Sequence, residues 1–400
     1  MKPLILIFSL FLFSCLFSDK SPAFESQRGP VVMAYYVPER DYNPEGIPVE
    51  KLTHIIYSFT NVIGGEMKFR DPEVAGEKLR QLVLQKERNP DLQVMIACGG
   101  WGADGFSDMA STLENRQKFV GSAIEFIEAY RLDGLDIDWE YPCIPAAGTG
   151  AREEDKQNFT SLMKELREAL NQLDRPQTLT FASAGWKPYY KNIELTEVMK
   201  YVDYMNVMTY DQIGATAPYT GHHTALGWIE EADVKDYPVM AYVERRKEEA
   251  AKRGYTFEPR SVERIVDFCI QEGTKPDQIV IGAAFYGRAW KGVHPAENGL
   301  YQPNGGSYIG WTAYHQIRKE FETNPDFSRH WDEVAKAPFL YNPVDSIFIS
   351  YDDTVSVKLK TQFAIDHKLG GIMFWELGND TKEANGLLDA IYDASLVESK

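Results

Sequence analysis

Short apolar runs alternate with amphipathic helical stretches along nearly the whole chain. Eight runs have the length and composition of buried strands: VVMAYYV (31–37), THIIYSF (53–59), QVMIAC (93–98), DGLDIDWE (133–140), TLTFASA (178–184), YMNVMTY (204–210), IVIGAAF (279–285) and GGIMFW (370–375). Helical patterns lie between them, at 77–88, 115–131, 153–173, 261–273 and 356–370. Such alternation produces parallel strands joined by crossover helices, so eight units predict an α/β fold, a closed (β/α)8 TIM barrel. A doubly wound open sheet is the alternative.

Two segments exceed what a barrel of about 250 residues needs. Residues 229–258 are charged and helical in pattern, and we expect them to form a solvated surface. Residues 291–346 carry enough aromatic side chains to pack as a small α+β subdomain on the rim of the barrel. The chain is therefore divided into a signal peptide (1–14), a linker (15–29) and a barrel (30–400) that contains the 291–346 insertion.

The overall charge restricts the kind of partner. The 400 residues are 44% hydrophobic, enough for a large core, and the formal net charge is −17. Binding to nucleic acid or to an anionic membrane surface requires clustered Lys and Arg, so this balance argues against both. A neutral or cationic substrate fits better, and we expect a monomer.

The N-terminal sequence MKPLILIFSLFLFSC has the features of a signal peptide. One Lys precedes an apolar run that is short for a membrane span. Leu12, Phe13, Ser14 and Cys15 resemble a bacterial lipobox, in which the Cys becomes the lipidated first residue. We therefore expect export, with a possible lipid anchor at Cys15. A plain secretory signal that loses Cys15 on cleavage is the alternative.

Acids alternate with large apolar residues in the run at 133–140. The order is Leu135, Asp136, Ile137, Asp138, Trp139 and Glu140. A period of two places the acids on one face of a strand and the apolar side chains on the other. In a half-exposed antiparallel strand the acids would face solvent, but a parallel barrel encloses both faces. The acids should then point into the barrel, with Glu140 at the carboxyl end of the strand, where such barrels place their chemistry.

The segment DGLDIDWEYP resembles the D-x-x-D-x-D-x-E signature of family 18 glycoside hydrolases, the chitinases, in all four acids. Other segments similar to those of the family are YMNVMTYD (204–211), FYGRAW (285–290), SYDD (350–353) and GGIMFWE (370–376). Five matches in the same order cover most of residues 30–390. The 291–346 insertion resembles the extra α+β domain of a bacterial subgroup.

This resemblance implies hydrolysis of β-1,4 linkages in chitin and chitooligosaccharides, with retention and with the substrate's 2-acetamido oxygen as nucleophile. It implies that Glu140 is the general acid and that Asp138 orients the acetamido group. Asp136 would share a proton with Asp138, because two enclosed carboxylates do not readily both ionise. Tyr210 would hold the acetamido oxygen. Asp133, at the strand start, would support the structure.

The resemblance also implies a set of sugar-binding side chains: Asp211, Met208, Trp375, Tyr286, Arg288 and Trp101. Trp375 would form the floor under the sugar on the non-reducing side of the cleaved bond, the −1 sugar. Trp101 would lie toward the leaving group. One position departs from the family pattern: the usual S-x-G-G is ACGG here, with Ala97 in place of Ser. Asp136 thereby loses an expected donor, and Tyr35 is the residue we expect to replace it.

Two other functions share parts of this pattern. An endo-β-N-acetylglucosaminidase acting on N-glycans would keep the same acids, whereas a chitin-binding lectin would keep the barrel and usually lack the acid. The presence of Glu140 argues against the lectin, and Tyr210, Asp211 and the rim insertion favour chitin. The 7 His residues show no metal-ligand spacing, so the sequence predicts neither a metal nor a cofactor.

Overall fold

The structure, a computed structural model, describes residues 29–39 and 42–396. Its centre is a closed barrel of eight parallel strands: β1 (Val31–Tyr36), β2 (His54–Ile63), β4 (Gln93–Gly99), β5 (Gly134–Asp138), β6 (Thr178–Ala184), β7 (Tyr204–Met208), β8 (Ile279–Ala284) and β14 (Gly371–Trp375). Strand β1 pairs with both β14 and β2, which closes the sheet. The predicted TIM barrel is thus confirmed, and the open sheet is excluded. The short β3 (Glu66–Lys68) forms a hairpin with the end of β2.

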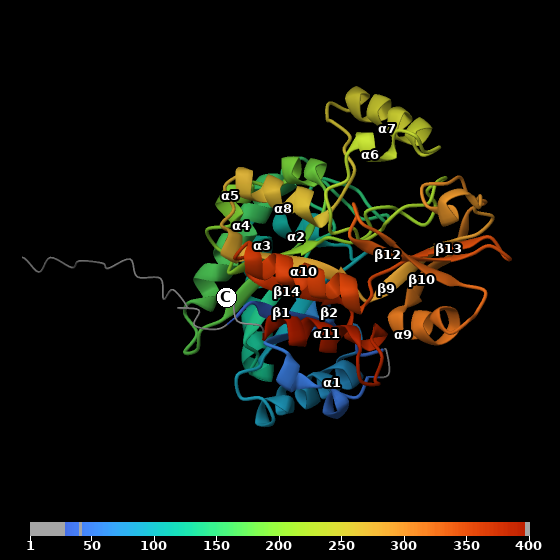
Figure 1. Ribbon diagram of the computed structural model, residues 1–400. Helices are drawn as coiled ribbons and strands as arrows, with labels where there is room; N and C mark the ends of the chain where they lie inside the picture. Colours follow the sequence, from blue (N-terminus) through green and yellow to red (C-terminus); the bar gives the residue numbers. More distant parts are fainter. Residues whose placement is uncertain (1–28, 40–41, 397–400) are drawn as a thin grey trace, which may run out of the picture.

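Helices surround the strands (Figure 1). They are α1 (Pro72–Leu84), α2 (Phe106–Ala110), α3 (Leu113–Tyr130), α4 (Asp155–Leu170), α5 (Leu195–Val198), α8 (Val262–Gln271), α10 (Thr354–Asp366) and α11 (Leu387–Ser395). Helix α1 begins five residues before the predicted range, because Asp71 caps it and Pro72 occupies its first position. No helix in residues 29–39 and 42–396 is long and apolar enough to cross a membrane. The predicted signal peptide and Cys15 lie outside the described residues.

The two faces of β5 have the predicted characters. Leu135, Ile137 and Trp139 belong to the large core between the strands and the helices. The Trp139 ring stacks on Phe106 of α2 with 5.4 Å between ring centroids. Asp136 is fully buried and bonds to side chains inside the barrel. The acids therefore project into the barrel, as the alternation predicts.

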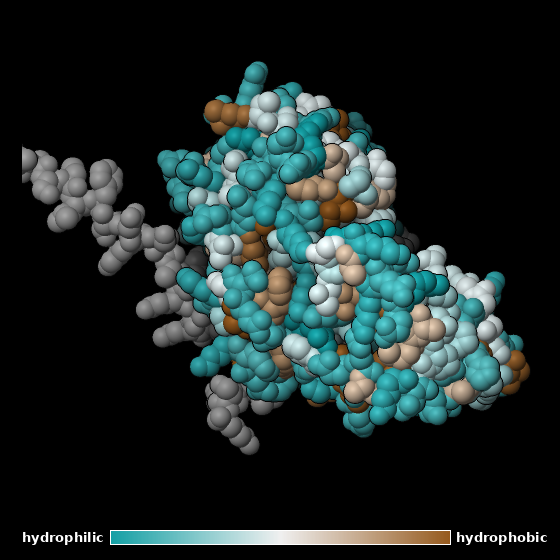
Figure 2. Space-filling view, turned by 90° about the horizontal axis from the view of Figure 1, so that it is seen from above, coloured by the Kyte–Doolittle hydropathy of each residue, from teal (hydrophilic) through white to brown (hydrophobic). Residues whose placement is uncertain are grey.

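The insertion before β14 is a five-stranded antiparallel sheet. Its order is β10 (Ser307–Ala313), β9 (Tyr286–Trp290), β13 (Ile347–Ser350), β12 (Ala337–Asn342) and β11 (Ser328–Asp332), with α9 (Tyr314–Gln316) at its edge. This sheet forms a lobe beside the barrel (Figure 1), and the surface on that side of the molecule mixes hydrophilic and hydrophobic residues (Figure 2). It starts before residue 291 and ends after residue 346, because β9 follows β8 after a single residue and β13 pairs with β9.

The segment 229–258 is helical, as predicted, and forms two helices, α6 (Glu231–Val234) and α7 (Met240–Lys252). Both stand apart from the barrel helices at the top of Figure 1. Val234, Val239 and Ala225 pack into a small core with Trp290 and Tyr301 of the inserted lobe. The segment therefore links the barrel to the lobe.

Candidate active site

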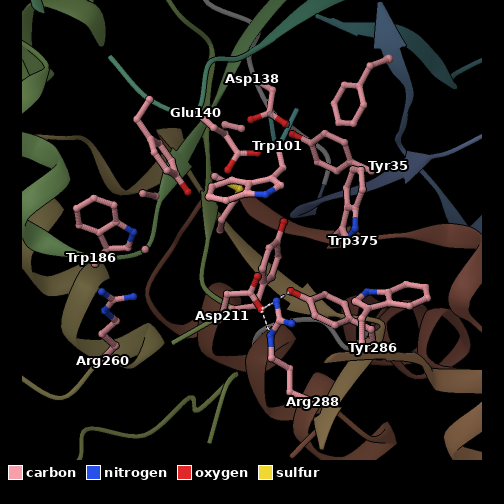
Figure 3. Close-up of a pocket in the computed structure, with 18 residues that line it drawn as sticks. Tyr35, Trp101, Asp138, Glu140, Trp186, Asp211, Arg260, Tyr286, Arg288 and Trp375 are labelled. Atoms are coloured by element: carbon pink, nitrogen blue, oxygen red, sulfur yellow. Dashed lines mark hydrogen bonds and ion pairs between the residues drawn. The ribbon is translucent and has the colours of Figure 1, made fainter. Parts of the chain in front are cut away.

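The carboxyl ends of the barrel strands surround a cavity of about 620 Å³. Ten of the eleven side chains predicted for the site line it: Tyr35, Trp101, Asp138, Glu140, Met208, Tyr210, Asp211, Tyr286, Arg288 and Trp375. The eleventh, Asp136, lies deeper in the barrel and is fully buried. Figure 3 shows Glu140 beside Asp138, with Trp375 on one side of them and Asp211 opposite.

Asp136 is held by three donors at the bottom of the site. Tyr35 donates to Oδ2 at 3.0 Å, and Thr180 and Asn206 donate to Oδ1 at 2.6 and 3.3 Å. Burial raises the pKa of Asp136 to about 6, while the three hydrogen bonds act to lower it. Tyr35 replaces the expected donor at Ala97, and Thr180 and Asn206 add to it.

Asp138 and Glu140 both have raised pKa values. Burial, followed by the charges of Glu140 and Asp136, raises the pKa of Asp138 well above its usual value. Burial also raises the pKa of Glu140 to about 7; a hydrogen bond with Tyr141 acts against this rise, and the charge of Asp211 adds to it. Asp138 Oδ1 is buried and has no hydrogen-bond partner among the described residues. The enclosed acid Glu140 thus stands next to a carboxyl group, Asp138, that has one buried oxygen without a partner.

The pKa of Asp211 is shifted in the opposite direction. Tyr286 donates to its Oδ1 at 2.9 Å, and Arg288 donates to the same oxygen through Nε at 2.7 Å. Burial acts to raise the pKa of Asp211, but His223 and Arg288 outweigh it and lower the pKa to about 2. Because burial lowers the pKa of His223, that imidazole is neutral at pH 7, and we assign the charge stabilisation to Arg288. The cavity therefore contains an ionised acid, Asp211, opposite two acids whose pKa values are raised.

Aromatic rings form much of the cavity wall. Trp375 stacks on Phe59 with 5.5 Å between centroids and lies 5.7 Å from Tyr35. Trp101 also lines the cavity and is 68% exposed, although Trp side chains are highly buried on average. Flat rings at the floor and the mouth can stack on the apolar faces of successive sugar units.

Several lining residues were not predicted from the sequence. They include Phe59, Tyr141, Trp186, Arg260 and Trp311. Trp311 comes from β10 of the inserted lobe and stacks on Tyr286, 6.0 Å between centroids. Thr180 and Asn206 were also missed, although each is a polar residue within a largely apolar strand, which is a usable signal for an inward-facing partner.

Nothing in the described part of the chain resembles a metal centre. No group of three His, Cys, Asp or Glu side chains is arranged to hold an ion there. The adjacent His222 and His223 have different partners: His222 Nε2 lies 3.0 Å from Asp332 Oδ2, and His223 contacts the backbone carbonyl of Tyr286. Both imidazoles thus contact residues of the inserted lobe, Asp332 on β11 and Tyr286 on β9.

Comparison with known proteins agrees with this geometry. The model of Glycosyl hydrolases family 18 matches residues 31–380. The chain belongs to this family. Chitinase A1 of Niallia circulans is 35% identical over 78% of this chain, and Chitinase B of Serratia marcescens is 29% identical over 92% of it. The matches cover 44% and 85% of those two proteins, so the chain corresponds to less than half of Chitinase A1.

Solved structures of family 18 have the same fold. A family 18 N-acetylglucosaminidase from Paenibacillus barengoltzii is 35% identical, with a TM-score of 0.78 over 91% of this chain and 99% of that one. Chitinase ChiA74 from Bacillus thuringiensis is 27% identical, with a TM-score of 0.81 over 93% of this chain and 71% of that one. The barrel described above is therefore the family 18 barrel.

Proposed function

We propose that this family 18 glycoside hydrolase is a chitinase that cleaves β-1,4 linkages between N-acetylglucosamine units, with retention of configuration. The observation that carries the proposal is the row of acids formed by Asp136 and Asp138 on β5 and by Glu140, two residues after the strand. Glu140, with a pKa of about 7, stands in an aromatic-walled cavity next to the unpartnered Oδ1 of Asp138. A proton donor and an acceptor for an amide N–H thus lie side by side.

The proposed reaction uses the substrate's own acetamido group. Glu140 gives its proton to the glycosidic oxygen while the acetamido oxygen of the −1 sugar bonds to the anomeric carbon and the leaving sugar departs. Asp138 accepts the acetamido N–H and stabilises the positive cyclic intermediate. Glu140 then takes a proton from the water that opens this ring. Tyr210, which lines the same cavity, orients the acetamido oxygen, and Asp211 binds a hydroxyl of the sugar.

The relatives named above support chitin over N-glycans, since Chitinase A1 and Chitinase B are both chitinases. A product assay separates the two substrates. We expect the protein to cleave N-acetylglucosamine oligosaccharides of three to six units and to leave a high-mannose glycopeptide intact. Mass spectrometry of the products measures both reactions. Efficient release of the glycan and inertness toward the oligosaccharides would reverse this choice.

The pKa of Glu140 predicts the alkaline limb of the pH profile. Only the protonated carboxyl can donate, and its protonated fraction falls as the pH rises through about 7, so kcat/KM should fall about tenfold per pH unit well above that value. Tyr141→Phe removes the hydrogen bond that lowers this pKa, so its limb should move to higher pH. A flat profile from pH 6 to pH 9 would contradict the role of Glu140.

For localisation we propose export with lipidation at Cys15, on the basis of the LFSC segment. The mature protein should begin at Cys15 and carry acyl chains, which mass spectrometry of its N-terminal peptide detects. Cys15→Ala should lose the acyl mass. A wild-type chain that begins after Cys15, or at an unmodified Cys15, would contradict lipidation, and export without a lipid anchor would remain.

A further inference from the structure

A second cavity of about 260 Å³ adjoins the active site. The two cavities share Gly185, Trp186 and Arg260 in their linings. Figure 3 places Trp186 and Arg260 on the opposite side of Glu140 from Trp375. If Trp375 supports the −1 sugar, the second cavity lies on the leaving-group side of the cleaved bond.

Its charge is opposite to that of the chain. Its lining contains five basic side chains, Lys187, Arg246, Arg253, Arg260 and Arg264, and one acid, Glu258. We refer to it as the arginine cavity. The whole protein has a net charge of −17, from which we expect a neutral or cationic substrate. The guanidinium groups of the arginine cavity instead create a local positive field next to the active site.

The single acid does not balance the arginine cavity. Glu258 Oε2 lies 2.6 Å from Lys187 Nζ and 3.7 Å from Arg264, so it is already shared by two cations. Arg246 has Glu249 at 3.2 Å and Arg264 has Glu230 at 3.5 Å, and both of these acids lie outside the lining. The Nε atoms of Arg246 and Arg264 are both buried and have no acceptor among the described residues.

Arg260 connects the two cavities, because it belongs to both linings. Its guanidinium lies over the Trp186 ring, 5.5 Å from the centroid, and within the described residues it has neither a carboxylate nor a hydrogen-bond acceptor. Burial, and then the like charge of Arg246, lower the pKa of Arg260, although an arginine stays protonated at neutral pH. An anion between Arg260 and Arg246 would relieve this repulsion and use the idle donors.

We propose that the leaving-group side of the cleft binds a saccharide unit that carries a carboxylate, with Arg260 as its principal partner and the arginine cavity as its seat. A guanidinium presents parallel N–H donors that match the two oxygens of a carboxylate. A neutral N-acetylglucosamine unit has no group that makes such a pair. This inference rests on the proposed function, since it extends the substrate from neutral to acidic N-acetylhexosamine oligosaccharides.

The arginine cavity also explains the 229–258 insertion. Arg246 lies on α7 and Arg253 directly follows that helix, while Arg260 lies in the segment that leads to α8. Tyr255, Thr256 and Phe257 of the same segment complete the wall. The insertion thus supplies one side of a binding surface, in addition to its contact with the lobe.

The test uses two substrates that differ only in charge. N-acetylglucosamine oligosaccharides of three to five units are oxidised at the reducing end to the aldonic acid, or reduced there to the alditol; both ends are open chains. Varying the length places the carboxylate one or more units beyond the cleaved bond, which the product masses locate. For the best length we expect kcat/KM for the acid to exceed that for the alditol about 5- to 10-fold at low salt, and this preference should shrink at 0.5 M NaCl.

Variants assign the preference to the arginine cavity. Arg260→Gln should bring the acid-to-alditol ratio close to one, and Arg260→Lys should keep part of it. Arg245→Gln is the matched control, because Arg245 is an exposed residue of α7 outside the lining and should keep the wild-type ratio. If Arg260→Gln is unfolded by its thermal transition, the exposed Arg253→Gln replaces it, with a smaller expected fall.

Equal rates for acid and alditol at every length would overturn the inference. So would a preference that survives in Arg260→Gln and Arg253→Gln. In both cases cleavage of the alditols still supports the proposed function. If wild-type protein cleaves neither series nor the unmodified oligosaccharides, the proposed function itself fails.

Discussion

Glu140→Gln should lower kcat on N-acetylglucosamine oligosaccharides by at least about 10²-fold, the usual contribution of general acid catalysis. The amide has the shape of the carboxyl group, but it cannot transfer a proton to the glycosidic oxygen. Binding should persist, because the rings of Trp375, Trp101 and Tyr35 remain in place around the cavity. Steady-state kinetics give the loss in kcat, and calorimetry with an intact oligosaccharide gives the affinity.

Glu153→Gln is the matched control. Glu153 is exposed and lies outside the cavity lining, so the same chemical change there should leave kcat and affinity unchanged. A Glu140→Gln variant with nearly wild-type kcat would contradict the assignment of the acid. A loss of affinity equal to the loss of rate would instead assign Glu140 to binding.

Removal of the N-acetyl group from the −1 sugar should abolish cleavage, with a loss of at least about 10³-fold, because the nucleophile is part of the substrate and its reaction is intramolecular. The other acids of β5 do not offer an alternative nucleophile: Asp136 is fully buried beneath the cavity and Asp138 precedes Glu140 along the strand. Oligosaccharides with a defined pattern of acetylation test this. Deacetylation of a sugar remote from the cleaved bond should be tolerated.

The same mechanism predicts the anomeric configuration of the products and a class of inhibitor. Water opens the cyclic intermediate from the face that the leaving group vacated, so fresh products should be β anomers by NMR. A stable thiazoline analogue of the intermediate should inhibit competitively. An α product, or efficient cleavage with a free amine at −1, would refute substrate assistance even if Glu140 remained the acid.

The barrel could be predicted because its signals are local. Each strand is enclosed on both faces and is therefore a nearly continuous apolar run, as in IVIGAAF, where β8 occupies 279–284. The direction of Asp136 and Asp138 also follows from a local period of two. The start of the inserted lobe was harder to predict, because it is defined by strand pairing. In the sequence β9 looks like the end of an apolar run, and only its pairing with β10 and β13 shows that the lobe begins there.

The site was predictable where residues follow a strand in sequence, and unpredictable where they meet only in space. Glu140, Tyr210 and Trp375 stand at strand ends. Thr180 and Asn206, by contrast, reach Asp136 across two neighbouring strands, β6 and β7. Arg260 is one charged residue among many in a polar segment, and its proximity to Trp186 and Arg246 appears only after the chain has folded.

Strand β9 of the lobe follows barrel strand β8 after a single residue, and this determines which parts of the lobe can vary between related proteins. Tyr286 and Arg288 lie on β9, next to Ala313 of β10 and Ser350 of β13, so the partners of Asp211 are fixed by the central strands of the lobe. The connection 333–336, between β11 and β12, takes no part in these pairs, whereas Tyr314 of the connection 314–327 donates its backbone N–H to the carbonyl of Phe285 at 3.0 Å. Lineages can therefore lengthen or exchange the 333–336 connection, and so alter which polymer surface the lobe meets, without changing the strands that hold Tyr286 and Arg288 against Asp211.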